Sequence, residues 1–250
     1  MTTEQTIEML RELKCLGMAE ALEQQQRTVK ANELSFDERV GLMVDAEYTW
    51  RQNKRFGRYL KDAKLRYSQA CIEDIDYCPK RKLDKSVILQ LASCGWVREN
   101  QSVIITGKTG VGKSYLACAL ANQACRKGYR AVYRRSPRLF EETTLAHASG
   151  TFIKLLSRFA KMDVMIIDDF GISPLSDADR RDLLEILEDR DGLKSTIVTS
   201  QLSPDVWHDY IAEPTVADAI CDRLLHSSHR IVLKGHSKRP ETAKKGRSKN

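Results

Sequence analysis

Residues Gly107-Lys108-Thr109-Gly110-Val111-Gly112-Lys113-Ser114 form a complete phosphate-binding loop. An apolar run at 103–106 precedes the loop and predicts a buried strand, and residues 115–124 predict a helix after it. Glycines let the backbone N–H groups turn toward a phosphate, and the N-terminus of the following helix adds a favourable dipole. We expect Lys113 to contact the β- and γ-phosphates and the Ser114 hydroxyl to bind Mg²⁺. The loop therefore predicts a site for ATP or GTP.

Short β-branched or apolar runs alternate with helical segments in the second part of the chain. We expect strands near residues 103–106, 130–133, 164–167, 196–199 and 230–233. Such alternation is typical of an α/β fold, in which a parallel sheet is flanked by helices and binds ligands at the carboxyl ends of its strands. Residues 1–75 instead show helical spacing, with a break at Gly17 and a capping box at residues 35–38. We predict a small all-α domain at 1–75, an ATPase domain at 76–234 and a disordered basic tail at 235–250.

The net charge of +7 over 250 residues favours a polyanionic partner, nucleic acid before a membrane surface. The tail from residue 234 carries seven Lys or Arg and one Glu, so the rest of the chain is close to neutral. The helical part carries a run of basic residues, and several of them fall on one face by their three- and four-residue spacing: Arg51, Lys54, Arg55, Arg58, Lys61, Lys64 and Arg66. A solvated face and a phosphate-binding face both fit that pattern. No apolar run approaches the ~18 residues of a membrane span, and we expect a cytoplasmic protein without a membrane partner.

Two adjacent carboxylates, Asp168 and Asp169, follow the apolar run at 164–167. The first, at the end of a buried strand, is placed to hold Mg²⁺ opposite Ser114. The second lies on the other face of the extended chain and is placed to orient an attacking water. A strand followed by a polar turn is common in isolation, but a phosphate loop upstream makes the catalytic interpretation the better one.

Hydrolysis of a γ-phosphate needs further polar and positive groups near its oxygens. The strand at 196–199 is followed by Ser200 and Gln201, and one of these two could bond the phosphate or the water. Arg223 lies late in the helical segment 216–225, where it could reach a neighbouring subunit. A surface ion pair with Asp218 or Asp222 explains Arg223 equally well, and spacing alone does not separate these interpretations.

Residues 83–239 resemble the AAA+ ATPases of the DnaC/DnaA clade, and within them the IstB-like helper ATPases of bacterial insertion sequences. The resemblance covers well over half of the chain, and the segment 10–24 resembles the same family less diagnostically. The stretches that carry it include residues 105–114, 116–120, 124–128, 135–139, 182–187, 195–202, 217–226 and 229–231.

The resemblance implies a five-stranded AAA+ core in which the strand at 196–199 lies between the strands that precede the phosphate loop and Asp168. It places Arg223 as an arginine finger supplied to the next subunit, and Gln201 or Ser200 as the polar sensor. Asp169 stands where most AAA+ proteins carry glutamate, which implies slow turnover. The small helical lid of many AAA+ proteins is expected to be absent. The implied nucleotide contacts are Gly107, Lys108, Thr109, Gly110, Val111, Gly112, Lys113, Ser114 and Tyr115.

The resemblance also implies a function: an ATP- and Mg²⁺-dependent regulator of transposition that forms a homo-oligomeric ring or filament on double-stranded DNA and recruits a transposase. In this clade the helices after the second strand contact DNA. The basic residues of that region, which suit phosphate contacts rather than base readout, are Arg130, Arg134, Arg135, Arg138, Lys154 and Arg158.

Three alternatives stay open at this point. A replicative helicase loader shares the fold and would use its N-terminal helices to bind a helicase. A small-molecule P-loop kinase would need an acceptor pocket, and it leaves Asp169 and Arg223 unexplained. A nucleotide-gated scaffold would assemble with ATP but would not depend on hydrolysis.

Overall fold

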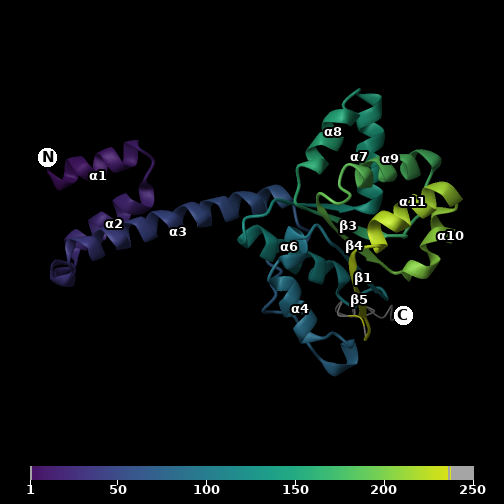
Figure 1. Ribbon diagram of the computed structural model, residues 1–250, viewed down its shortest axis with the longest axis horizontal. Coiled ribbons are helices and arrows are strands. Elements are labelled where there is room, and N and C mark those ends of the chain that lie inside the picture. The colour runs from purple at the N-terminus through teal and green to yellow at the C-terminus, as the bar shows by residue number, and fades with distance from the viewer. Residues whose placement is uncertain (1, 236, 238–250) are drawn as a thin grey trace, which may run out of the picture. The chain divides into compact units, whose positions relative to one another are not determined.

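The computed structural model describes residues 2–235 and residue 237 (Figure 1). The chain divides into two compact units, Met1–Tyr59 and Leu60–Asn250. The division falls earlier than the expected domain boundary at residue 75. Residues 60–75 belong to the second unit because they pack on its core, where Asn122 donates to the carbonyl of Ser68 at 3.2 Å. Most of the expected tail lies outside the described residues.

The first unit is helical and contains α1 (Thr3–Glu12), α2 (Leu16–Arg27), the 3₁₀ turn η1 (Val29–Glu33) and most of α3 (Phe36–Ala63). Its small core consists of Ile7, Ala19 and Leu22, with Leu10 and Met43 packed against them. The predicted capping box is present at the start of α3, where the Ser35 hydroxyl accepts the Glu38 N–H at 3.3 Å and the Glu38 carboxylate accepts the Ser35 N–H at 2.8 Å.

Gly17 lies inside α2, so the predicted helix break at this residue is wrong. The break comes earlier, at Lys14, whose φ of 59° is left-handed. Gly17 is required instead by close packing, because a Cβ there would lie 2.6 Å from the carbonyl oxygen of Ala46 in α3. The Glu47 carboxylate accepts the Gly17 N–H at 2.8 Å and the Met18 N–H at 3.2 Å, which places a negative charge at the N-terminus of α2.

The second unit is built on a five-stranded parallel sheet in the order β2-β3-β4-β1-β5. This confirms the predicted sheet and the position of the inserted strand β4 between β3 and β1. The three central strands form from β-branched and apolar runs that are buried on both faces, as is typical of parallel sheets, whereas the two edge strands are partly exposed. Their bounds are β1 Ser102–Gly107, β2 Ala131–Arg135, β3 Val164–Phe170, β4 Ser195–Ser200 and β5 Ser228–Leu233.

Helices cover both faces of the sheet (Figure 1). One face carries α6 (Lys113–Arg126), which packs on β1 to β4 and is contacted by α4 (Lys85–Ala92). The other face carries α7 (Ser136–Ala148), α8 (Phe152–Ala160), α9 (Asp177–Glu188), α10 (Trp207–Ile211) and α11 (Pro214–Leu225). The remaining short helices are η2 (Pro79–Arg81), α5 (Gly95–Arg98) and η3 (Pro204–Val206).

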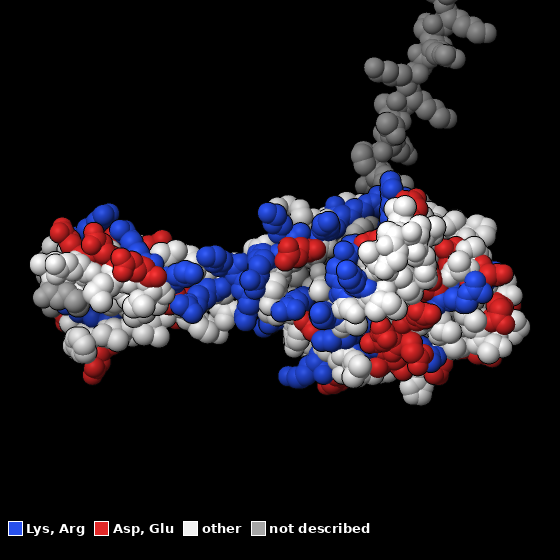
Figure 2. Space-filling view, turned by 90° about the horizontal axis from the view of Figure 1, so that it is seen from above, with Lys and Arg blue, Asp and Glu red and all other residues white. Residues whose placement is uncertain are grey.

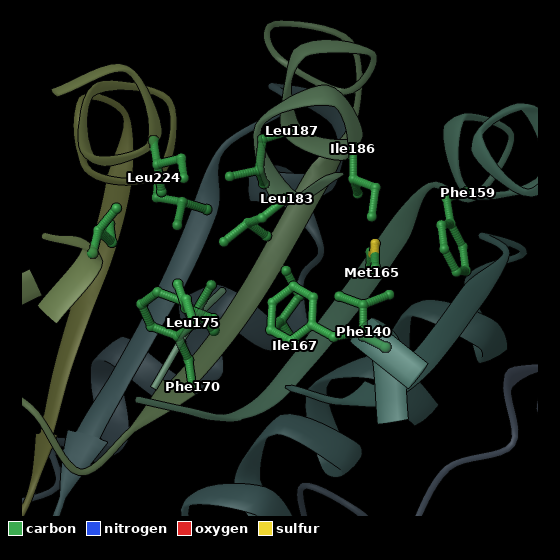
Figure 3. Close-up of a cluster of buried hydrophobic side chains, with 14 of the residues drawn as sticks. Phe140, Phe159, Met165, Ile167, Phe170, Leu175, Leu183, Ile186, Leu187 and Leu224 are labelled. Atoms are coloured by element: carbon green, nitrogen blue, oxygen red, sulfur yellow. The ribbon is translucent and has the colours of Figure 1, made fainter. Parts of the chain in front are cut away.

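The main hydrophobic core lies between the sheet and the layer formed by α7 to α11 (Figure 3). Met165 and Ile167 of β3 point into this layer and meet Leu183 and Ile186 of α9. All four are almost fully buried. Because β3 is fixed from both faces, the polar residues at its carboxyl end are held on a rigid support.

None of the described helices is long and apolar enough to cross a membrane. Within residues 2–235 no helix follows β5, and the segment in which a lid would come next, 236 and 238–250, is outside the described residues. The absence of a lid therefore stays a prediction.

Candidate functional site

The phosphate-binding loop connects β1 to α6 in the way the sequence predicts. Gly112 has a φ of 99°, which is left-handed, and it is the N-cap of α6. Gly107 has a φ of 147°, and a Cβ there would lie 2.3 Å from the carbonyl oxygen of Leu233 in β5. Glycine is required at both positions. Gly112 and Gly107 both have a positive φ, and the backbone of β5 also lies too close to Gly107 for a side chain. The loop is therefore fixed by the sheet beneath it.

Lys113, the first residue of α6, is 6% exposed. Its ammonium donates to the carbonyl oxygens of Gly107 at 2.8 Å and Lys108 at 3.1 Å, which holds the charge over the loop. A phosphate oxygen is a stronger acceptor than a carbonyl because it is charged. The ammonium is therefore placed to bind an anion that enters the loop.

Asp168 is fully buried near the end of β3. One carboxylate oxygen accepts the Tyr133 hydroxyl at 2.6 Å, and the other accepts the Thr199 hydroxyl at 2.5 Å. Burial raises the pKa of Tyr133, and the adjacent carboxylate raises it further, so the phenol keeps its proton for this bond. The Arg66 guanidinium lies 3.7 Å from the same carboxylate. These partners hold the carboxylate in one orientation.

Asp169 follows at an irregularity in the pairing of β3 with β4, between Ile167 and Phe170. Its φ is 60°, and its N–H donates to the Thr199 hydroxyl at 3.0 Å. The carboxylate accepts a hydrogen bond from Arg135 Nε at 2.7 Å, and Arg66 lies 3.9 Å away. Two guanidinium groups therefore flank the carboxylate that we predict to orient the attacking water.

A cleft of about 860 Å³ lies over the phosphate loop within the second unit. Its size suits a nucleotide. The loop and Asp169 form one part of its lining, and aromatic, basic, acidic and aliphatic residues form the rest. Residues of the lining include Thr109, Gly110, Gly112, Lys113, Ser114, Tyr115, Arg66, Tyr67, Arg81, Arg135, Asp169 and Gln201.

The two candidates for the polar sensor are separated by their contacts. Gln201 lines the cleft, and its side-chain oxygen accepts the Thr109 hydroxyl of the phosphate loop at 2.7 Å. Ser200 is fully buried, and its hydroxyl donates to the Phe170 carbonyl at 2.6 Å and accepts the Leu202 N–H at 3.0 Å. Ser200 thus joins β3 to β4 and does not line the cleft, which favours Gln201 as the sensor.

Arg223 does not line the cleft of its own chain. It forms an ion pair with Glu188, not with Asp218 or Asp222, and donates to the Ala219 carbonyl at 2.9 Å. It lines a different cavity beside Ser102, at the amino end of β1. The structure therefore does not support a role for Arg223 in the nucleotide site of its own subunit. It is compatible with a role in the site of a neighbouring subunit.

The residues predicted to bind DNA fall into three groups. Arg134 and Arg158 both pair with Glu142, and Arg138 pairs with Glu141. Burial alone would raise the pKa of Glu142, but the two arginines outweigh it and hold the pKa below its ordinary value. Arg135 belongs to the cleft and not to the α7–α8 surface, whereas Arg130 and Lys154 are exposed.

Sequence reasoning missed Arg66, Arg81, Tyr133 and Thr199. Arg81 is 8% exposed and donates to the carbonyl of Val111 in the phosphate loop at 2.9 Å. Tyr133 and Thr199 lie on β2 and β4, the strands on either side of β3, and the strand order could have indicated them. Nothing in the local sequence around Arg66 or Arg81 points to the cleft.

Ser114 lines the cleft, whereas Asp168 is fully buried and is not among the lining residues. Both side chains carry oxygen donors of the kind that Mg²⁺ prefers, and Mg²⁺ keeps several waters as further ligands. Among residues 2–235 and 237 no group of three or more His, Cys, Asp or Glu could form a protein cage for a metal. A water-rich Mg²⁺ that also binds phosphate needs no such cage.

Comparison with known proteins places the chain among ATP-binding proteins of insertion sequences. The family described as IstB-like ATP binding protein matches residues 8–246. An ATP-binding protein of insertion sequence IS1162 from Pseudomonas fluorescens is 49% identical over 202 residues, which are 81% of this chain and 87% of that protein. An insertion sequence ATP-binding protein from Sinorhizobium fredii is 42% identical over 240 residues, 96% and 98% of the two chains.

Solved structures with lower sequence identity share the fold. The DnaC helicase loader gives a TM-score of 0.56 at 24% identity and covers 68% of this chain and 99% of its own. DnaA from Aquifex aeolicus, bound to AMPPCP, gives 0.55 at 18% identity, over 66% of this chain and 50% of its own. The second unit therefore has the AAA+ P-loop fold.

Proposed function

Because the chain belongs to the family of IstB-like ATP binding proteins, we propose that it is an ATP-dependent regulator of DNA transposition. It binds Mg²⁺ and ATP, assembles on duplex target DNA and recruits a transposase. The observation that carries this proposal is the cleft in which the phosphate loop, Asp169 and Gln201 lie together. The names of the relatives supply the link to insertion sequences.

Each group of the cleft has a distinct task in the proposed hydrolysis. Lys113 would bind the β- and γ-phosphates, and Ser114 and Asp168 would hold a Mg²⁺ ion, which would neutralise charge on the phosphates. Asp169 accepts a hydrogen bond from the attacking water and orients it, and Gln201 donates to the water or the γ-phosphate. Arg81 positions the loop through the carbonyl of Val111.

ATP joins neighbouring subunits if Arg223 completes the site of the next chain. In the unassembled chain, the ion pair with Glu188 holds the Arg223 side chain in place. Arg223→Ala should keep ATP affinity in the monomer but lower hydrolysis in the assembled protein, measured as phosphate release. Glu188→Gln is the matched control: it frees Arg223 and should leave hydrolysis equal or higher. Unchanged hydrolysis in Arg223→Ala would remove the trans role.

Electron microscopy of the protein with duplex DNA tests the assembly directly. We expect rings or filaments with ATP and with a non-hydrolysable analogue, and their loss with ADP. Asp169→Asn should assemble normally with ATP but disassemble slowly, whereas a pure scaffold would show no difference. Particles that stay monomeric with every nucleotide would refute the proposal.

A helicase loader remains the second candidate because the DnaC loader shares the fold. That likeness, at 24% identity, speaks for the fold alone, while the insertion-sequence relatives are 42–49% identical. Copurification separates the two functions: a loader should retain the replicative helicase in the absence of DNA, and a transposition regulator should retain the transposase.

A further inference from the structure

One face of α3 carries four basic side chains within two helical turns. Arg51, Lys54, Arg55 and Arg58 are spaced three or four residues apart and are all exposed, and we call them the basic face. All four lie in the first unit, Met1–Tyr59. Figure 2 shows Lys and Arg side chains gathered over this half of α3. The basic face is far more concentrated than the mixed charges of the α7–α8 surface.

The charges of the basic face are mostly not neutralised by carboxylates. Arg51 pairs with Glu47, but within residues 2–235 no carboxylate forms an ion pair with the other three. The Lys54 ammonium lies 4.5 Å from the centre of the Trp50 ring, and the Arg58 guanidinium 5.4 Å from that of Tyr59. Aromatic contacts of this kind orient a cation and leave its charge available to a second partner.

The surroundings of the basic face identify the class of partner. The large exposed hydrophobic residues of α3, such as Phe36, Val44 and Tyr48, all precede it, and none occurs among residues 51–59. A membrane-binding helix would pair its cations with an apolar face, and a protein groove would need apolar anchors. A linear array of cations with no large exposed hydrophobic residue among residues 51–59 instead matches a phosphodiester backbone.

We infer that the basic face binds the phosphate backbone of duplex DNA, an inference that rests on the proposed function and assigns its DNA surface. Residues 51 and 58 lie about 10 Å apart along the helix at a rise of ~1.5 Å per residue. That length covers about three phosphates of one strand, which are ~3.4 Å apart along the duplex axis. Contacts of this kind position the protein on DNA without selecting a sequence.

The test compares two variants that each remove two positive charges from the first unit. Lys54→Gln/Arg58→Gln changes the basic face, and Lys14→Gln/Arg27→Gln changes exposed residues outside it. Binding of the full chain with ATP to a labelled duplex is measured by fluorescence anisotropy across a range of salt concentrations. The loss of two phosphate contacts should reduce the slope of log K against log salt by about 1.8, with weaker binding to every sequence. The control should keep the slope of the unchanged protein.

The outcomes distinguish this inference from the proposed function. If the unchanged protein does not bind duplex DNA with any nucleotide, both fail together. If it binds but the two variants keep its slope, or shift it equally, the inference alone is overturned. A Lys54→Gln/Arg58→Gln protein that binds DNA normally but no longer retains the transposase would also overturn it, and would assign the basic face to a protein partner.

Discussion

Arg135→Ala should raise the basal rate of ATP hydrolysis. Arg135 Nε donates to one oxygen of the Asp169 carboxylate at 2.7 Å, and this bond competes with a water for that oxygen and draws on its negative charge. The Arg135 side chain is 46% exposed, so solvent screens the pair and its contribution is about 0.2–1 kcal/mol. A difference of 1 kcal/mol corresponds to about fivefold in an equilibrium. Since Arg66 at 3.9 Å remains as a second cation, we expect a rise of up to about fivefold.

The assay is steady-state phosphate release at saturating ATP and Mg²⁺, in the absence of DNA. Arg138→Ala is the matched control, because it removes an exposed arginine that pairs with Glu141 outside the cleft, and its rate should not change. Affinity for ATP is measured in parallel to separate binding from turnover. A tenfold fall in the rate of Arg135→Ala with unchanged affinity would refute the reasoning, since it would mean that Arg135 stabilises charge on the phosphate and does not restrain Asp169.

Other changes test the loop, the sheet edge and the helical unit. Lys113→Ala should abolish both ATP affinity and ATP-dependent assembly on DNA, and assembly retained without ATP binding, seen by sedimentation, would contradict nucleotide gating. Thr199→Val leaves the Asp169 N–H without its acceptor and should cost about 1–3 kcal/mol in urea unfolding, together with weaker Mg²⁺-dependent ATP binding; an unchanged midpoint would contradict this. Although burial alone would raise it, the pKa of Glu47 is held below its ordinary value by Arg51 and by the N–H groups of α2. The stabilisation by Glu47 is therefore present above about pH 4.5 and is lost as the pH falls below that value. The protection of the amides of residues 16–25, taken relative to their intrinsic exchange rates at each pH, should therefore fall in acid, and Glu47→Gln should remove this fall.

The sheet could be predicted from the sequence because its signals are local. Each strand is a short apolar run, and the phosphate loop identifies the edge at which ligands bind. Asp168 was predicted for the same reason, since a carboxylate directly after a buried strand at that edge has few other uses. The position of β4 came from the family resemblance and is confirmed by its pairing with β1 and β3.

The partners of these residues could not be predicted because they depend on tertiary contacts. Arg135 was assigned to the DNA surface because the family resemblance places DNA contacts in its region, yet β2 lies beside β3 and brings Arg135 into register with Asp168. Ser200 and Gln201 are adjacent in sequence, and only the burial of one and the exposure of the other separates them. Arg81 reaches the loop from a segment that precedes β1 by about twenty residues.

The left-handed backbone at Asp169 explains why the shorter acid can be an advantage at this position. With φ at 60°, side-chain bulk near the main chain is penalised, and aspartate and asparagine tolerate this conformation better than most residues. A glutamate side chain would reach further toward a nucleotide, but glutamate is less favourable than aspartate in the left-handed backbone conformation at this position. Asparagine, in contrast, would keep the turn and lose only the charge. A substitution of Asp169 by glutamate that is meant to raise the rate of ATP hydrolysis should therefore be combined with changes to the backbone turn at this residue.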